Sequence, residues 1–262
     1  MLPDFAVPDI LVLAYHAVSS RWRSELAVDP GTLERQLREL LGRGYRPARF
    51  TDAVTQPLAR RTLAVTFDDA YRSVHTLAFP VMRRLGVPGT VFVPTDFAGT
   101  DRPMAWPGID HWLGTEHERE LVPMGRDELR ELDAMGWEIG SHTRSHPQLM
   151  DLSDELLRAE LVESRAWCEE LLAKPCRSLA YPYGDTDARV IAAARRAGYE
   201  AACTLHRRFR APDGLAWPRI EPAGTGALLQ LKLHPVTRRL RASQVAWAPV
   251  TAFRYLQAVS RR

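Results

Sequence analysis

Cysteine is scarce in this sequence of 262 residues, which contains only Cys168, Cys176 and Cys203 and no CxxC pair. An odd number of thiols cannot be fully paired within one chain. The scarcity therefore argues against a disulfide-bonded secreted domain and favours a reducing compartment.

Long hydrophobic runs are also missing. No stretch is long enough to span a bilayer, and the first residues lack the basic segment and the small-residue cleavage site of a signal peptide. The short apolar run from Ile10 to Tyr15 predicts a buried strand instead. We therefore expect a cytoplasmic enzyme without a transmembrane segment.

An excess of one charge is absent too, because 35 basic residues face 32 acidic ones and the net charge is +3. This balance gives no reason to expect a nucleic-acid partner. Arginines do gather near the C-terminus, at Arg238, Arg239, Arg241, Arg254, Arg261 and Arg262. They would favour peripheral contact with an anionic glycan or lipid surface, and a solvated basic face is the simpler alternative.

Short apolar runs alternate with helical patterns along most of the chain, which is typical of parallel strands joined by crossover helices. Strands are predicted at 10–15, 62–67 and 89–93. Asp29 followed by Pro30 predicts a helix start, and an apolar stripe from Val74 to Leu85, with Leu77 on it, predicts another helix. The irregular segment 94–124 is long enough to suggest that it covers a site.

This pattern predicts one domain of the α/β class, a distorted or incomplete (β/α) barrel. Its core is expected at about residues 10–222, followed by a basic C-terminal extension, 223–262. In such a barrel, catalytic side chains lie where strands end, because the following loops converge around one mouth.

Three polar clusters follow predicted strands: Asp68 with Asp69, His142 with His146, and the Tyr-Pro-Tyr-Gly segment 181–184. Each alone has a simpler explanation as turn, capping or packing residues. Together they indicate a metal site, because two imidazoles four residues apart and a carboxylate can bind one cation and leave positions open. Pro147 disfavours a helix at His146, so the two histidines are expected on a loop.

A divalent cation at this site would acidify a bound water and polarise an acyl oxygen, and a second carboxylate could take the water's proton. Asp68 and Asp69 can share these tasks if the strand gives way to a turn between them. The sequence lacks both the GxSxG turn of serine hydrolases and a glycine-rich phosphate loop.

The motifs TFDD, SHTRSH and YPYG, in this order, resemble those of the polysaccharide deacetylases, also called carbohydrate esterase family four or the NodB homology domain. The resemblance extends from about Ile10 to Ile220. It implies a distorted (β/α) barrel with Asp68 as catalytic base and with Asp69, His142 and His146 as metal ligands. It also implies zinc, or another divalent transition ion such as cobalt or nickel, and a backbone N–H of Tyr183 that stabilises the oxyanion.

Two features depart from the family pattern. Many members have an arginine in the third motif that orients the base, where this chain has Ala180; from its strand-end position, Arg219 is our candidate for that role. The family's late histidine, a general acid, corresponds to His234, although its surroundings equally suit a basic helix or tail. His16, directly after the first strand, is a second candidate, and it could instead bond a loop carbonyl.

Several aromatic residues and one acidic residue near the motifs each have two possible roles. Trp106, Trp112, Tyr181 and Tyr183 would suit a platform for sugar rings, while core packing is the commoner fate of aromatics. Glu138 shares strand parity with His142, so it either points into the barrel mouth or serves as a buried structural carboxylate.

Hydrolysis of an N-acetyl group on an amino-sugar glycan or glycolipid is the function that these observations favour. An O-acetyl esterase acting on xylan or another glycan is the nearest alternative, since the same site would serve it. A glycosidase using Asp68 and Glu138 would not need the two histidines. A non-catalytic glycan-binding module is the alternative that the altered third motif suggests.

Overall fold

The computed structural model describes residues 8–57, 59–205 and 214–222. Within these residues, parallel strands follow one another around a curved sheet. They are β1 (Asp9–Tyr15), β5 (Arg61–Phe67), β6 (Gly89–Val93), β7 (Glu138–Ser141), β8 (Ser178–Ala180), β9 (Ala201–Leu205) and β10 (Trp217–Arg219). Backbone hydrogen bonds of Ile220 with Val12 and Ala14, each 2.9 Å, nearly close the sheet into a barrel. The predicted distorted barrel is confirmed.

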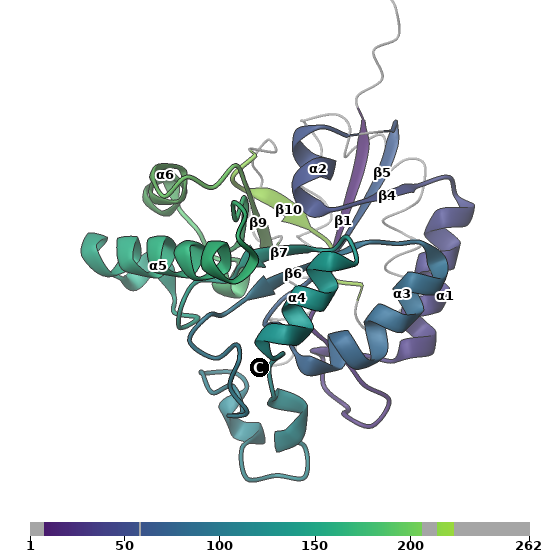
Figure 1. Cartoon of the computed structure of the whole chain (residues 1–262), viewed down its shortest axis with the longest axis horizontal. Coiled ribbons are helices and arrows are strands. Elements are labelled where there is room, and N and C mark those ends of the chain that lie inside the picture. The colour runs from purple at the N-terminus through teal and green to yellow at the C-terminus, as the bar shows by residue number, and fades with distance from the viewer. Residues whose placement is uncertain (1–7, 58, 206–213, 223–262) are drawn as a thin grey trace, which may run out of the picture.

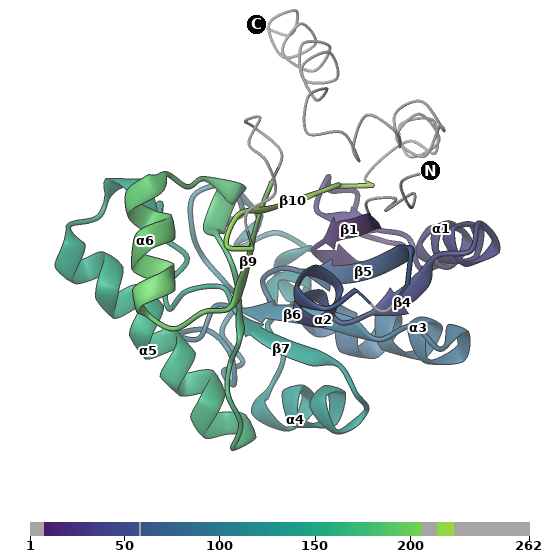
Figure 2. The same cartoon turned by 90° about the horizontal axis from the view of Figure 1, so that it is seen from above.

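Helices surround these strands (Figures 1 and 2). They are α1 (Pro30–Gly42), α3 (Phe79–Leu85), α4 (Arg126–Ala134), α5 (Asp154–Leu172) and α6 (Ala188–Arg196). Two short strands, β2 (Ala17–Val18) and β3 (Ala27–Val28), form a separate pair after β1. No helix in the described residues is both long and apolar enough to cross a membrane.

At the amino end of the barrel, β4 (Arg46–Ala48) joins the sheet and α2 (Phe50–Thr55) covers the strands. β4 pairs with the first half of β5 and β6 with the second half, so the sheet is irregular here. Phe50 belongs to an apolar cluster with Val12, Ala64 and Phe92, from three strands of the barrel. Figure 1 shows α2 at the end of the strands opposite the long teal segment that follows β6.

Two helix starts follow the predicted capping chemistry. The Asp29 carboxylate accepts hydrogen bonds of 3.0 Å from the backbone N–H groups of Gly31 and Thr32, with Pro30 in the first turn. The Ser153 hydroxyl similarly accepts the N–H of Leu156 at the start of α5. These caps fix where α1 and α5 begin, and so how the chain leaves the preceding loops.

The helix predicted from Val74 to Leu85 is interrupted. Its first turn is a π-helix, η1 (Val74–Ala78), and α3 begins only at Phe79. The extra residue in a π turn shifts the following side chains around the axis. Val74 and Ala78 are therefore buried, whereas Leu77 is 40% exposed, and its predicted place on the buried stripe is wrong.

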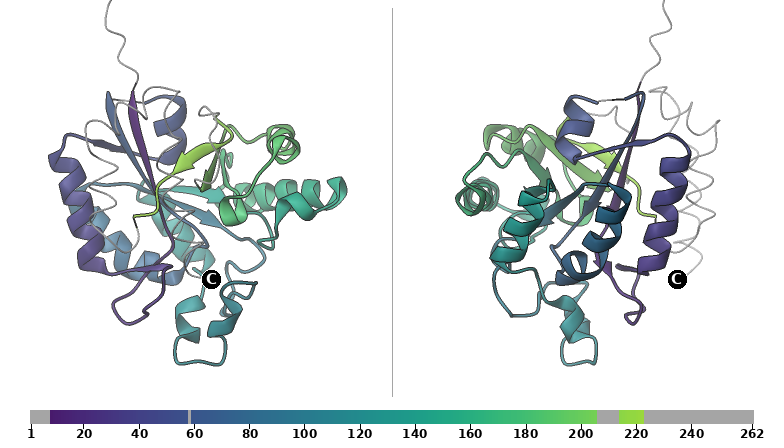
Figure 3. Two further views of the ribbon diagram at one scale, coloured as in Figure 1. Left: turned by 180° about the vertical axis from the view of Figure 1, so that it is seen from behind. Right: turned by 45° about the vertical axis from the view of Figure 1, so that its right-hand side comes forward.

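Segment 94–124 projects from the carboxyl end of the barrel, at the bottom of the views in Figures 1 and 3. It contains only the short turns η2 (Asp110–Trp112) and η3 (Glu118–Leu121). Met104, Ile109 and Leu121 on it are nevertheless buried against the main core. Core packing thus holds this irregular segment beside the mouth of the barrel.

Candidate active site

The predicted site residues converge on one cleft of about 520 Å³ at the carboxyl end of the barrel. Its wall includes His16, Asp68, Asp69, His142, His146 and Tyr183. These residues follow β1, β5, β7 and β8, so strands far apart in sequence supply one site. Arg219, the last residue of β10, is buried behind this wall and reaches the site through Asp68.

Asp69, His142 and His146 form the cluster of the described residues that could hold a metal ion. One ligand atom of each lies within 4.8 Å of the others. Asp69 Oδ1 is 3.3 Å from His142 Nε2 and 3.5 Å from His146 Nε2, yet this buried oxygen makes no hydrogen bond. Unsatisfied buried polar atoms are rare, and an oxygen with two imidazole nitrogens is a suitable donor set for a divalent transition ion. The three side chains therefore fit a cation.

The turn after β5 gives the two adjacent aspartates separate partners. The Asp68 N–H continues the β-ladder by donating to Tyr15 O at 2.9 Å, whereas Asp69 and Ala70 adopt left-handed φ values of 66° and 53°. The strand therefore ends between the two carboxylates. Asp69 points to the histidines and Asp68 to Arg219.

The two imidazoles are oriented by different contacts. His142 Nδ1 donates to Ala180 O at 2.8 Å, which leaves Nε2 free as a ligand atom. His146 Nδ1 has no hydrogen-bond partner, and its ring instead stacks on Trp106 with centroids 4.2 Å apart at 19°. Tyr183 meets the same ring edge-on at 4.7 Å. Segment 94–124 has no regular periodicity, so Trp106 could be predicted as a candidate sugar platform but not as a partner of His146.

Arg219 binds Asp68 through both guanidinium nitrogens. Nη1 donates to Oδ1 and Nη2 to Oδ2, each at 2.6 Å, and Nη1 also donates to Thr66 Oγ1 at 3.0 Å. Burial favours the neutral carboxyl, but the guanidinium charge outweighs it and holds the pKa of Asp68 well below its ordinary value. Asp68 is therefore ionised at neutral pH.

The pKa values of the two histidines shift in opposite directions. Burial lowers the pKa of His146 to about 3, so this imidazole is neutral at pH 7, as a metal ligand must be. Burial acts in the same direction on His142, but the carboxylates of Asp68 and Asp69 outweigh it and raise the pKa. A cation binds the neutral form of His142, so metal affinity should fall as the pH drops through the raised pKa of this residue.

Of the remaining candidates, His16 and Tyr183 lie within the described residues and His234 lies outside them. His16 Nε2 lies 3.9 Å from Asp68 Oδ2 and lines the cleft. Tyr183 has a left-handed φ of 59°, so the third motif turns sharply at the cleft wall. His234 and the extension 223–262 lie outside the described residues.

Comparison with known proteins identifies the family of this chain. The model of the family described as polysaccharide deacetylase matches residues 55–202, more than half of the chain. The chain belongs to this family. A poly-beta-1,6-N-acetyl-D-glucosamine N-deacetylase of Staphylococcus epidermidis is 24% identical over 163 residues, which are 59% of this chain and 51% of that protein. The chain thus spans about half the length of this curated relative.

Solved structures of deacetylases share the fold. IcaB from Ammonifex degensii has a TM-score of 0.69 and 24% identity, with 89% of this chain and 97% of that one covered. The Streptococcus pyogenes deacetylase PplD, solved in complex with acetate, has a TM-score of 0.68 and 21% identity, with 84% and 96% covered. At this identity the likeness establishes the same barrel fold for this chain.

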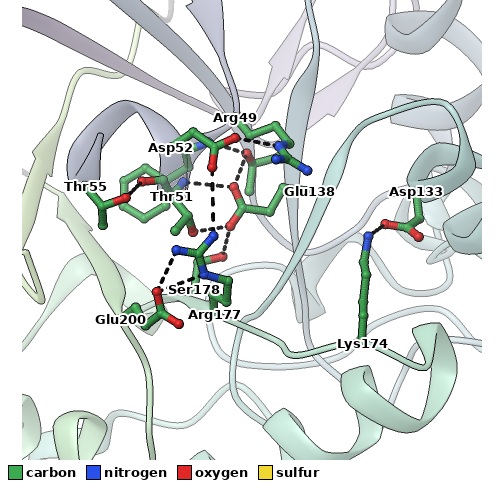
Figure 4. A network of polar contacts seen from close by, with 12 residues as sticks. Arg49, Thr51, Asp52, Thr55, Asp133, Glu138, Lys174, Arg177, Ser178 and Glu200 are labelled. Carbon is green, nitrogen blue, oxygen red and sulfur yellow. Dashed lines mark hydrogen bonds and ion pairs between the residues drawn. The ribbon is translucent and has the colours of Figure 1, made fainter. Parts of the chain in front are cut away.

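Glu138 does not line the cleft. It lies at the amino end of β7, where its carboxylate accepts hydrogen bonds from Thr51 N (2.9 Å), Ser178 Oγ (2.7 Å) and Thr90 Oγ1 (3.2 Å), the first two drawn in Figure 4. Of its two possible roles, the structure shows the structural one, with the carboxylate only partly buried. Asp68 and Glu138 lie at opposite ends of their strands, which removes support for a glycosidase pair.

The aromatic candidates separate into core and cleft. Tyr181 is buried and donates to Leu215 O at 2.8 Å, so it is a core residue. Trp112 packs edge-on against Trp22 at 5.6 Å and also lines the cleft, as do Trp106 and Tyr183. Three of the four aromatics can therefore contact a bound sugar. Three charged residues that the sequence analysis did not single out also line this cleft: Arg23, Glu25 and Glu221.

Proposed function

We propose that this protein is a metal-dependent hydrolase that removes N-acetyl groups from an amino-sugar glycan or glycoconjugate. The convergence of Asp69, His142 and His146, with the ionised Asp68 next to them, carries the proposal. The Staphylococcus epidermidis relative, named for poly-β-1,6-N-acetyl-D-glucosamine, supports an N-acetylglucosamine polymer as the substrate.

Zinc is the proposed cofactor, with cobalt or nickel as substitutes. One carboxylate and two imidazoles are donors that these ions accept, and such a three-ligand set leaves positions open, as catalytic sites do. A cation held by these residues would acidify water and polarise the acyl oxygen of the substrate.

The residues of the chain supply the proton transfers. Asp68 takes a proton from the attacking water as the water oxygen bonds to the amide carbon. The backbone N–H of Tyr183 donates to the acyl oxygen as negative charge develops there, an interaction whose loss typically costs about 3 kcal/mol. His16 donates a proton to the nitrogen as the carbon–nitrogen bond breaks, and acetate and the free amine leave.

Replacing Arg219 with alanine should slow turnover and change its pH dependence. Without the guanidinium, burial raises the pKa of Asp68, so activity falls as the pH drops through this raised value. Because a charge-assisted hydrogen bond contributes about 1.5–3 kcal/mol, we expect kcat/KM to fall at least about tenfold. pH profiles of Arg219→Ala and Arg219→Lys measure this, with lysine retaining part of the rate. An unchanged rate and profile in the alanine variant would show that Arg219 does not orient the base.

Replacing His16 with glutamine should lower kcat on an N-acetylated sugar about 100-fold, the range of a lost general acid. The same variant should hydrolyse 4-nitrophenyl acetate nearly as fast as the wild type, because that leaving group departs without a proton. His111→Gln is the matched control, since His111 lines the cleft from segment 94–124. Equal losses on both substrates would contradict a general acid at His16.

Acetate release tests the proposed activity directly. N-acetylated β-1,6-linked glucosamine oligomers, chito-oligomers and acetylxylan are each incubated with the zinc-loaded protein. Release from the amino sugars but not from acetylxylan is expected. Release from acetylxylan alone would identify an O-acetyl esterase, and binding of the oligomers without acetate would identify a glycan-binding module.

We also predict where the protein is located in the cell and which surface it contacts. A cytoplasmic location, and contact of the basic extension 223–262 with a membrane surface, follow from composition alone. Fractionation of cells expressing the full chain with and without residues 223–262 tests both.

A further inference from the structure

The loop that carries both histidine ligands has an unusual backbone. It runs from His142 to His146 between β7 and η4 (Leu149–Asp151). Thr143 and His146 have left-handed φ values of 66° and 61°. Residues with a Cβ adopt this conformation reluctantly, and it persists where the surroundings hold it in place.

Glu160, in the middle of α5, provides the main contact that holds this loop. Its Oε2 accepts the backbone N–H groups of Arg144 at 2.8 Å and Ser145 at 2.9 Å, and its Oε1 accepts the Ser145 hydroxyl at 2.6 Å. The residue is only 7% exposed. Hydrogen bonds to a buried carboxylate are shorter and stronger than those between neutral groups, so the loop is tied firmly to the helix.

Ser164, one helical turn further along α5, holds the start of the same loop. Its hydroxyl is 2.8 Å from Ser141 Oγ, and Ser141 Oγ accepts the N–H of Thr143 at 3.0 Å. Thr143 Oγ1 in turn accepts the N–H of His146 at 3.2 Å. One face of α5 therefore fixes the path of the chain between the two ligands.

We propose that Glu160 is a positioning residue that sets the separation of the His142 and His146 imidazoles, and thereby the affinity for the cation. The inference rests on the proposed function, because it assigns Glu160 a role toward the same metal. Among the described residues, the Glu160 side chain forms hydrogen bonds and ion pairs only with Arg144 and Ser145, which lie between the ligands, and Glu160 does not belong to the ligand cluster. Its contribution acts through the backbone of the loop.

Zinc affinity, measured by competition with a chromogenic chelator, tests this role. Loss of residues that orient metal ligands typically costs about 10–100-fold in affinity, and this is expected for Glu160→Ala. Glu160→Gln should stay within a few-fold of the wild type, because its amide oxygen can accept both N–H groups. Glu163→Ala is the matched control, since Glu163 lies on the same helix, exposed, and binds only the Arg144 side chain.

Two further measurements separate positioning from folding. The visible absorption of the cobalt-loaded protein should change in Glu160→Ala and not in Glu163→Ala, because it reports ligand geometry. Ser145→Ala loses one of the three hydrogen bonds to Glu160, so its zinc affinity should fall by less than that of Glu160→Ala. This variant provides the test if Glu160→Ala does not fold. Wild-type zinc affinity in both variants, whatever their melting temperatures, would overturn the role of Glu160 alone. A wild-type protein that binds no zinc would overturn the proposed function as well.

Discussion

Asp68→Asn should lower kcat about 1,000-fold, within the range of roughly 100- to 10,000-fold that a general base contributes. Asparagine keeps the shape of the side chain but cannot take the proton of the attacking water. Asp68 is not a member of the ligand cluster, so zinc affinity should change little. Steady-state acetate release and chelator competition on the same preparation measure the two effects.

The arginine contact gives this experiment its internal control. Arg219→Ala leaves the carboxylate in place, so its loss of rate should be smaller than that of Asp68→Asn. The double variant should be no slower than Asp68→Asn alone, because Arg219 acts through Asp68. Retention of most of the wild-type rate in Asp68→Asn would show that another group is the base.

His142→Ala should weaken zinc binding more than about 100-fold, because losing a ligand exceeds the effect of losing a residue that orients one. Acetate release at one equivalent of zinc should then fall below detection. His75→Ala is the matched control: His75 lies on η1, where it bonds Glu131 at 3.0 Å, and it does not line the cleft. Zinc affinity equal to that of His75→Ala would contradict the assignment of His142.

The sequence predicts the barrel and the ligand set because both depend on local signals. Short strands followed by polar residues define the ends where loops meet: His142 directly follows β7, Asp69 comes two residues after β5, and His146 lies on the loop that leaves β7. The order of the three motifs then points to the family. Parallel strands bring their carboxyl ends to one edge, so strand ends predict proximity.

The contacts that hold the site are not accessible from the sequence. Glu160 has the spacing of an ordinary helical residue, and only the path of the loop above it reveals three hydrogen bonds. The stack of Trp106 on His146 depends on how segment 94–124 folds back over the barrel. The π turn from Val74 to Ala78 leaves Leu77 on the surface, and the nearby Pro80, which has no N–H to donate, marks a break in the helix without giving its register.

The role of Arg219 could be predicted only in part from the sequence. Its place at a strand end suggests a partner for Asp68, although 151 positions separate them. Ala180, where the family resemblance leads us to expect an arginine, is a fully buried member of the cluster inside the barrel, and the Arg219 guanidinium lies over Phe92 of the same cluster. The guanidinium thus reaches Asp68 from β10 in this protein.

Zinc titration of the metal-free protein, with acetate release recorded at each addition, tests the central claim most directly. If Asp69, His142 and His146 hold a catalytic cation, activity should start near zero, rise in proportion to added zinc and level off at one equivalent. Full acetate release from protein shown by metal analysis to contain no cation would contradict it.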